Sequence, residues 1–299
     1  MDARVVADVD CATGEGPLWH PEQKVIYWVD IPNGKLFQYD PATEEHELVF
    51  EGPPIGGFTI QEDGQLLLFM AQGRVALWDP YGDPDQELVV VIEEIPAERD
   101  NRFNDVIADP AGRVFCGTMP KADRAAHLYR LDPDGTLDLL LDDVGLSNGM
   151  GFTPDRKGFY YTDTRKATIT LFDYDEETGA ISHPRPFAEV SEEPGQGHPD
   201  GMTVDADGNV WSARWDGHCL VKYSPEGVEL DRITFPVPKV SSVTFGGEDY
   251  TDMYVTTAST DNREEEGPLA GSLFHLNLGV RGTPEFRSRI RIPSSTFST

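Results

Sequence analysis

The sequence predicts an all-β fold. Short segments rich in β-branched and aromatic residues recur along the chain, turn sequences with Asp, Pro and Gly separate them, and no long stretch has the period of an amphipathic helix. The expected strands, in chain order, are residues 25–31, 66–71, 75–80, 114–119, 128–133, 158–164, 170–175, 209–215, 220–225 and 252–258. The expected turns between them are residues 40–45, 62–65, 109–113, 132–136, 175–180, 205–209 and 224–228.

The expected strands and turns form a repeat. Its matched first positions are Glu15, Gly56, Asn104, Asn148, Asp200 and Ser241, at intervals of 41, 48, 44, 52 and 41 residues. Four short strands in a unit of about 40–50 residues are typical of a propeller blade, so six units predict a six-bladed β-propeller. We expect residues 1–299 to form this single domain, with segment 3–9 pairing with the final strands to close the ring. An irregular pair of β-sandwiches would not explain the recurring phase of the turns.

Four of the six matched positions are good oxygen ligands. Equivalent positions in a radial repeat face one axis, so Glu15, Asn104, Asn148 and Asp200 are expected to converge in the central channel. Two carboxylates and two amide carbonyls suit Ca²⁺, Mg²⁺ or Mn²⁺, and the absence of His and Cys argues against structural zinc. Each of these residues alone would be an ordinary turn residue. Their occurrence at the same position of four repeat units favours a metal site.

Two further groups near these positions have candidate roles. Arg102 lies two residues before Asn104 and would share its face of a strand, where it balances carboxylate charge and binds a polyol or a carboxylate; a surface ion pair is the alternative. Asp200, as a metal-bound carboxylate beside an activated water, is a candidate general base. Asp30 and Asp163 are expected to be turn or inter-blade hydrogen-bonding residues. The positions expected around the mouth of the channel are His198, Trp215, Asp216 and a lid at 121–126.

The charge composition describes a strongly acidic surface. The chain has 24 Lys and Arg residues against 53 Asp and Glu residues, which gives a net charge of −29. The acidic residues are spread along the chain, so we expect a solvated surface that repels itself at low salt. This predicts a protein of a halophilic microbe, a monomer, and no nucleic-acid partner, because no basic stripe is present.

The remaining composition indicates a soluble cytoplasmic protein. The cysteines Cys11, Cys116 and Cys219 are odd in number and lack metal-type spacing, which is typical of buried thiols in a reducing compartment. There is no run of 18 apolar residues, so no membrane partner is expected. The first 16 residues lack the basic-then-apolar layout of a signal peptide.

Four segments together resemble the senescence marker protein/gluconolactonase/regucalcin family of sugar lactonases. They are GEGPLW, RFNDVIADPAGRVFCGTM, SNGMGFTPDRKGFYYTDT and HPDGMTVDADGNVWSARW, which begin at residues 14, 102, 147 and 198. The resemblance covers essentially the whole chain and implies a six-bladed β-propeller with one divalent cation in its central channel. It implies Glu15, Asn148 and Asp200 as metal ligands, Arg102 and Asn104 as substrate-binding residues, and Asp200 as the catalytic base.

The implied reaction is metal-dependent hydrolysis of a sugar lactone, a pentono- or hexonolactone, to the aldonic acid. The metal would polarise the carbonyl and help to activate the water, and Ca²⁺, Zn²⁺, Mn²⁺, Mg²⁺ and Fe²⁺ are the candidates. Val106 stands where the family often has glycine, and PKADRAA replaces an acidic loop of animal members, which leaves the particular sugar open. The alternatives are an organophosphate or aryl-ester hydrolase on the same propeller and a non-catalytic calcium-binding propeller.

Overall fold

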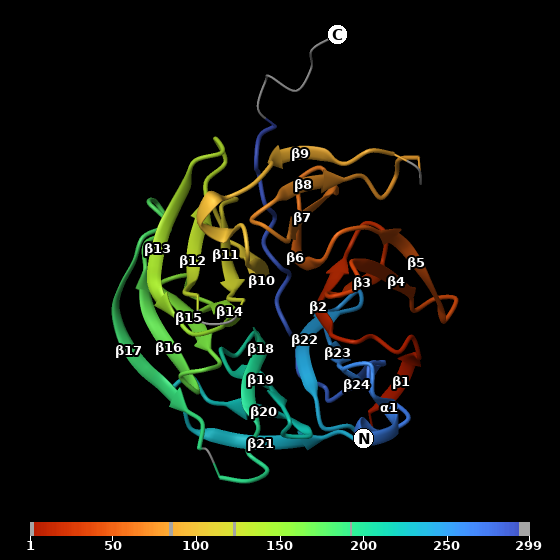
Figure 1. Ribbon diagram of the computed structural model, residues 1–299. Helices are drawn as coiled ribbons and strands as arrows, with labels where there is room; N and C mark the ends of the chain where they lie inside the picture. Colours follow the sequence, from red (N-terminus) through yellow and green to blue (C-terminus); the bar gives the residue numbers. More distant parts are fainter. Residues whose placement is uncertain (1–2, 84–85, 122–123, 192, 293–299) are drawn as a thin grey trace.

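The computed structural model is a ring of six four-stranded antiparallel sheets around a central axis (Figure 1). It describes residues 3–83, 86–121, 124–191 and 193–292. In each sheet the strands follow one another in chain order from the axis outward. The exception is the outermost strand of the sixth sheet, which comes from the start of the chain. This confirms the predicted six-bladed propeller.

The strands of the first three blades, from the axis outward, have the following bounds. Blade I contains β2 (Gly14–His20), β3 (Val25–Asp30), β4 (Lys35–Asp40) and β5 (Glu45–Glu51). Blade II contains β6 (Ile55–Ile60), β7 (Leu66–Met70), β8 (Val75–Trp78) and β9 (Val89–Ile92). Blade III contains β10 (Arg102–Ala108), β11 (Val114–Met119), β12 (Ala126–Leu131) and β13 (Leu137–Val144).

The other three blades complete the ring. Blade IV contains β14 (Ser147–Phe152), β15 (Gly158–Asp163), β16 (Thr168–Tyr174) and β17 (Ile181–Glu189). Blade V contains β18 (His198–Val204), β19 (Val210–Trp215), β20 (Cys219–Tyr223) and β21 (Glu229–Thr234). Blade VI contains β22 (Val240–Gly246), β23 (Asp252–Thr257), β24 (Leu273–Asn277) and β1 (Arg4–Ala7). Two one-turn helices lie in loops: a 3₁₀ turn at Pro96–Glu98 and α1 at Arg263–Glu266.

The ring is closed by pairing of the two ends of the chain, as predicted. Strand β1 pairs antiparallel with β24, for example Val5 with Phe274. The edge of the last sheet is therefore covered by the first segment of the chain, which joins distant parts of the sequence in one blade. Figure 1 shows this junction, with red β1 beside blue β24.

Burial decreases from the axis outward. The inner strand β6 is buried along its whole length, whereas most residues of the outer strands β5 and β21 are exposed. The core lies mainly between neighbouring blades, where alternate side chains of adjacent sheets pack together; Phe69 of blade II meets Phe103 of blade III edge-to-face. The cysteines Cys11, Cys116 and Cys219 are free and buried, as expected.

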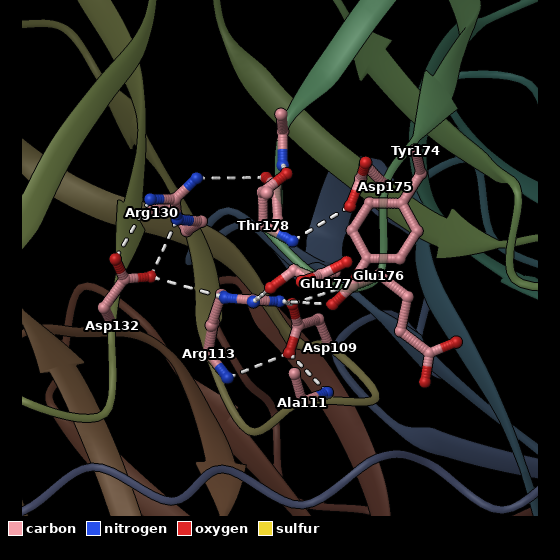
Figure 2. A network of polar contacts seen from close by, with 12 residues as sticks. Asp109, Ala111, Arg113, Arg130, Asp132, Tyr174, Asp175, Glu176, Glu177 and Thr178 are labelled. Carbon is pink, nitrogen blue, oxygen red and sulfur yellow. Dashed lines mark hydrogen bonds and ion pairs between the residues drawn. The ribbon is translucent and has the colours of Figure 1, made fainter.

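A polar network also joins blades III and IV (Figure 2). The fully buried carboxylate of Asp109 accepts hydrogen bonds from Arg113 Nη1 at 2.8 Å and from the Tyr174 hydroxyl at 2.7 Å. Arg113 Nη1 also donates to the carbonyl oxygen of Glu176 at 3.0 Å, and Arg113 Nε lies 3.6 Å from Asp132 Oδ1. A turn of blade III is thereby fixed to the last turn of blade IV.

The C-terminal segment 279–292 crosses one end of the central channel (Figure 1, dark blue). Its backbone hydrogen-bonds turns of several blades: Arg281 O accepts from Ala206 N, Ser288 N donates to Ile60 O, and Arg289 N donates to Gly112 O. These turns all follow the carboxyl ends of inner strands. The amino ends of the inner strands, where the predicted ligands lie, are therefore at the opposite end of the channel. Among the described residues, no helix has the length and hydropathy to span a bilayer.

Candidate functional site

Every inner strand departs from regular pairing at its matched position. The register between the inner strand and its neighbour shifts at six places: Glu15/Leu18, Ile55/Gly57, Phe103/Val106, Ser147/Met150, Pro199/Met202 and Val240/Ser242. A bulge leaves the inserted residue unpaired and re-aims side chains, and such bulges are common beside active sites. The matched residue lies within the shift in blades II to VI, and in blade I the matched Glu15 pairs with Val29 directly before the shift.

Glycine follows the matched residue in four of the six blades. In blades II, IV and V the inner strands approach each other closely at this glycine, whereas Gly16 of blade I adopts a φ of +55°. A Cβ on Gly149 would lie 2.6 Å from the carbonyl oxygen of Asp200, and a Cβ on Gly201 would lie 2.2 Å from Ser242 Oγ. Neither distance is sterically possible. The NG and DG pairs of the sequence therefore serve close packing of strands around the channel, in addition to turn formation.

Three carboxylates of the channel, those of Glu15, Asp105 and Asp200, influence one another electrostatically. Glu15 and Asp200 are 3% and 4% exposed. The pKa of Glu15 is raised mainly by burial and further by the nearby carboxylates of Asp200 and Asp105. The pKa of Asp200 is likewise raised mainly by burial and further by Asp105. Burial raises the pKa of Asp105 itself to about 7. Asp105 is the residue that the sequence reasoning missed; the available signal was an Asp in the place that glycine takes in four of the other blades.

Arg102 is the cation of this cluster. Burial lowers the pKa of its guanidinium to about 10, against the opposing effect of Glu15, Asp105 and Asp200, so Arg102 remains charged at neutral pH. Its Nη1 donates to Asn104 Oδ1 at 2.6 Å and to the carbonyl oxygen of Phe103 at 2.8 Å. Arg102 and Asn104 therefore lie together, as the i, i+2 spacing predicted, and the surface ion pair is excluded.

The two amide side chains form a continuous hydrogen-bonded series. Asn104 Nδ2 donates to Ser147 O and to Asn148 Oδ1, both at 2.8 Å. Asn148 Nδ2 donates to Thr164 Oγ1 at 2.8 Å, and Thr164 Oγ1 donates to Pro199 O at 2.7 Å. Each amide oxygen accepts one hydrogen bond: Asn104 Oδ1 from the charged guanidinium of Arg102, and Asn148 Oδ1 from the neutral amide of Asn104. This difference supports separate roles for the two amides.

The other two matched positions have structural roles. Ser241 Oγ donates to Gly14 O at 2.6 Å and lies 3.0 Å from Thr256 Oγ1. Gly56 lies against the backbone of Phe103, where a Cβ would be 2.0 Å from the carbonyl oxygen. Blades VI and II thus contribute packing at this depth of the channel, where the other four blades contribute polar side chains.

Asp30 and Asp163 hold turns, as the sequence predicted. Asp30 accepts hydrogen bonds from Thr13 N at 3.0 Å and from Asn33 Nδ2 at 2.8 Å. Asp163 accepts from the backbone nitrogens of Gly145 and Leu146, at 2.9 and 3.1 Å. His198 and Asp216 line a groove of about 630 Å³ beside the mouth of the channel. Residues 122–123 lie outside the described residues, so a lid at 121–126 stays a prediction.

The channel continues past the carboxylates as a small cavity of about 70 Å³. Asp105, Met150, Met202 and Ser242 line it, together with Glu285 of the C-terminal segment. Burial raises the pKa of Glu285 to about 7. The cavity has room for a few water molecules, and Glu285 places the segment 279–292 at its border, at the carboxyl ends of the inner strands.

The donor set suits a hard cation only if amide oxygens take part. Among the described residues, no three His, Cys, Asp or Glu side chains converge closely enough to form a metal cluster by themselves. Glu15, Asp200 and Asn148 together offer two carboxylates and one amide oxygen, a set that fits Ca²⁺, Mg²⁺ or Mn²⁺ better than a thiolate- or imidazole-binding metal. Burial and, after it, neighbouring carboxylates raise the pKa values of Glu15 and Asp200, and a dication bound between them would favour their charged forms.

Comparison with known proteins agrees with this arrangement. The family model described as SMP-30/Gluconolactonase/LRE-like region matches residues 13–259. The chain is 50% identical to pentonolactonase XacC of Haloferax volcanii over 299 residues, covering 98% of this chain and 100% of that protein. It is 34% identical to regucalcin of Bos taurus over 291 residues, covering 93% of this chain and 95% of that protein.

A solved structure shows the same fold. Regucalcin from Agrobacterium tumefaciens, described as a calcium-binding protein, superposes with a TM-score of 0.88 at 24% identity, covering 96% of this chain and 97% of that chain. At this identity the likeness concerns the fold alone. The family match, the two sequence relatives and the inner-strand geometry lead to one conclusion: the chain belongs to the SMP-30/gluconolactonase/LRE-like family.

Proposed function

We propose that this chain is a hydrolase that opens a sugar lactone to the aldonic acid, with a pentono- or hexonolactone as substrate. One observation supports this most directly: the charged guanidinium of Arg102 is hydrogen-bonded to Asn104 and interacts with the carboxylates of Glu15, Asp105 and Asp200 at the amino ends of the inner strands. A polyol ester needs hydrogen-bond donors for its hydroxyls and charge stabilisation at its carbonyl, and this site offers both. The 50% identity to a pentonolactonase gives independent support.

Glu15, Asn148 and Asp200 are the residues that would hold a divalent cation. Their oxygens come from blades I, IV and V, and the single hydrogen bond that Asn148 Oδ1 accepts from Asn104 Nδ2 leaves it a second lone pair for a cation. When bound, the cation would polarise the lactone carbonyl and lower the pKa of a nearby water. The candidates remain Ca²⁺, Mg²⁺, Mn²⁺, Zn²⁺ and Fe²⁺, because affinity at such a site depends on small differences of geometry and on availability.

Side chains of the protein would orient the substrate and transfer the proton. Arg102 and Asn104 hold the ring hydroxyls so that the carbonyl carbon faces the attacking water. Asp200 takes a proton from that water as the oxygen of the water adds to the carbonyl carbon. The bond between that carbon and the ring oxygen then breaks, and the ring oxygen takes up the proton that Asp200 received, which gives the open aldonic acid and restores the carboxylate. No Ser or Cys nucleophile is needed.

The test is a panel of aldonolactones in high salt, with protein stripped by a chelator and then reloaded with single metals. We expect acid release above spontaneous hydrolysis on one or two lactones, and only after reloading. A phosphotriester and an aryl ester in the same panel test the alternative hydrolase. Binding of a metal without turnover of any ester would instead favour a calcium-binding propeller and contradict the proposal.

A further inference from the structure

We propose that Thr164 is a positioning residue that orients the amide of Asn148 and ties it to the backbone that presents Asp200. The inference rests on the metal site proposed above. Thr164 directly follows β15, on blade IV, and its hydroxyl makes two short contacts: it accepts from Asn148 Nδ2 at 2.8 Å and donates to Pro199 O at 2.7 Å. It thus contacts one proposed ligand, Asn148, and the residue directly before another, Asp200.

The direction of these hydrogen bonds follows from the chemistry of the groups. The carbonyl of Pro199 can only accept, so the single hydroxyl proton of Thr164 must be directed to it. The hydroxyl oxygen can then only accept from Asn148, and an amide donates through its nitrogen. Asn148 Nδ2 must therefore face Thr164, and Asn148 Oδ1 must face the opposite way.

That opposite side is where the oxygen is needed. Asn148 Oδ1 accepts from Asn104 Nδ2 at 2.8 Å, so its direction along the series is fixed at both ends. If the amide turned by half a rotation, its NH₂ group would face the channel and oppose a cation instead of binding it. The hydroxyl of Thr164 therefore selects the amide orientation that can serve as a ligand, an outer-shell role known to matter at metal sites.

Thr164 is itself held by its backbone and has no equivalent in the other blades. Its nitrogen donates to Leu146 O at 3.1 Å, two residues before Asn148, and its carbonyl accepts from Ala167 N at 3.0 Å. The residues that follow the second strand of the other five blades are Ile31, Ala71, Pro120, Asp216 and Ala258. A hydroxyl at this position is found in blade IV alone, beside the one amide proposed as a ligand.

The test measures metal binding directly. Chelator-stripped protein in high salt is titrated with Mn²⁺ in a calorimeter, without any lactone. Thr164→Val removes the hydroxyl at nearly constant volume, and we expect it to weaken Mn²⁺ binding about 10–100-fold. Thr164→Ser restores the hydroxyl and should bind like the parent. Thr164→Ala removes the same group without the added methyl and serves if the valine variant does not fold.

A matched control is available two residues earlier. Thr162 lies on β15 and is fully buried, and its hydroxyl is directed to the sulfur of Met202, at 3.7 Å. Thr162→Val makes the same chemical change on the same strand and should leave Mn²⁺ binding unchanged. An equal loss of affinity in Thr162→Val and Thr164→Val would assign the effect to the strand as a whole and overturn the inference.

A double-mutant cycle separates orientation from other effects. In Asn148→Asp the ligand has two equivalent oxygens, so it has no orientation to lose. Thr164→Val should therefore cost much less affinity in the Asn148→Asp background than in the parent. The same loss in both backgrounds would refute an orienting role. If the parent itself binds no divalent cation, the proposed metal site fails together with this inference, whereas unchanged binding in Thr164→Val refutes this inference alone.

Discussion

Replacing Asp105 by asparagine is expected to stabilise the metal-free protein above neutral pH. The pKa of Asp105 is about 7 in the folded channel, against a usual value of 3.8. The native state therefore holds a proton that the unfolded chain releases, so this group lowers the free energy of unfolding progressively as the pH rises from about 4 to about 7. The neutral amide of the Asp105→Asn variant carries no charge at any of these pH values and removes that loss.

The magnitude follows from the difference between the two pKa values. At about 1.4 kcal/mol per pKa unit, the complete loss at alkaline pH is about 4 kcal/mol. Asp105 is partly exposed to the channel, where water screens it, so we expect a gain of about 1–3 kcal/mol in Asp105→Asn at pH 8 and a smaller gain at pH 5. Adding a divalent cation should narrow the difference, because the cation neutralises the carboxylates.

The assay is urea unfolding at constant high salt with a chelator present, at pH 5 and pH 8. Asp142→Asn is the control, since Asp142 is an exposed aspartate of β13 and its replacement changes the net charge equally. A gain of the same size at both pH values, or the same gain in Asp142→Asn, would show that the effect comes from net charge. A loss of stability in Asp105→Asn at pH 8 would refute the conclusion that burial of the Asp105 carboxylate raises its pKa.

Four other predictions address the site, the surface and the fold. Asp200→Ala or Glu15→Ala should abolish lactone hydrolysis and calorimetric metal binding while circular dichroism stays that of the parent; an unchanged rate in either contradicts the ligand set. Arg102→Met should lower kcat/KM about 10–100-fold through lost charged hydrogen bonds, with metal affinity nearly unchanged. Because the net charge is −29, the free energy of unfolding should rise from dilute buffer to molar salt, and equal stability in both would refute the halophilic prediction. Arg113→Met should cost about 3 kcal/mol of unfolding free energy, because it leaves the buried carboxylate of Asp109 without its cation; a loss below about 1 kcal/mol would mean that Tyr174 and the backbone suffice.

The repeated pattern of the chain was sufficient to predict the propeller and the positions from which the site is built. Strand periodicity and turn chemistry are local properties, so six matched segments could be recognised before any contact was known. The same matched positions predicted that Glu15, Asn104, Asn148 and Asp200 converge, and the i, i+2 spacing predicted that Arg102 lies beside Asn104. In a radial repeat, equivalent positions face one axis, so side chains far apart in sequence are brought together without knowledge of the packing.

Which side chains interact at the site depends on contacts between blades. These contacts leave no periodic pattern in the sequence. The third carboxylate, Asp105, enters the cluster because the bulge of β10 interrupts strand alternation. Thr164 contacts Asn148 within blade IV and Pro199 of blade V across the junction of the two blades, and segment 279–292 closes one end of the channel through contacts with several blades. Local sequence preference specifies each blade, but bulge register and the fit between neighbouring blades set which side chains touch, and these arise only when the ring is closed.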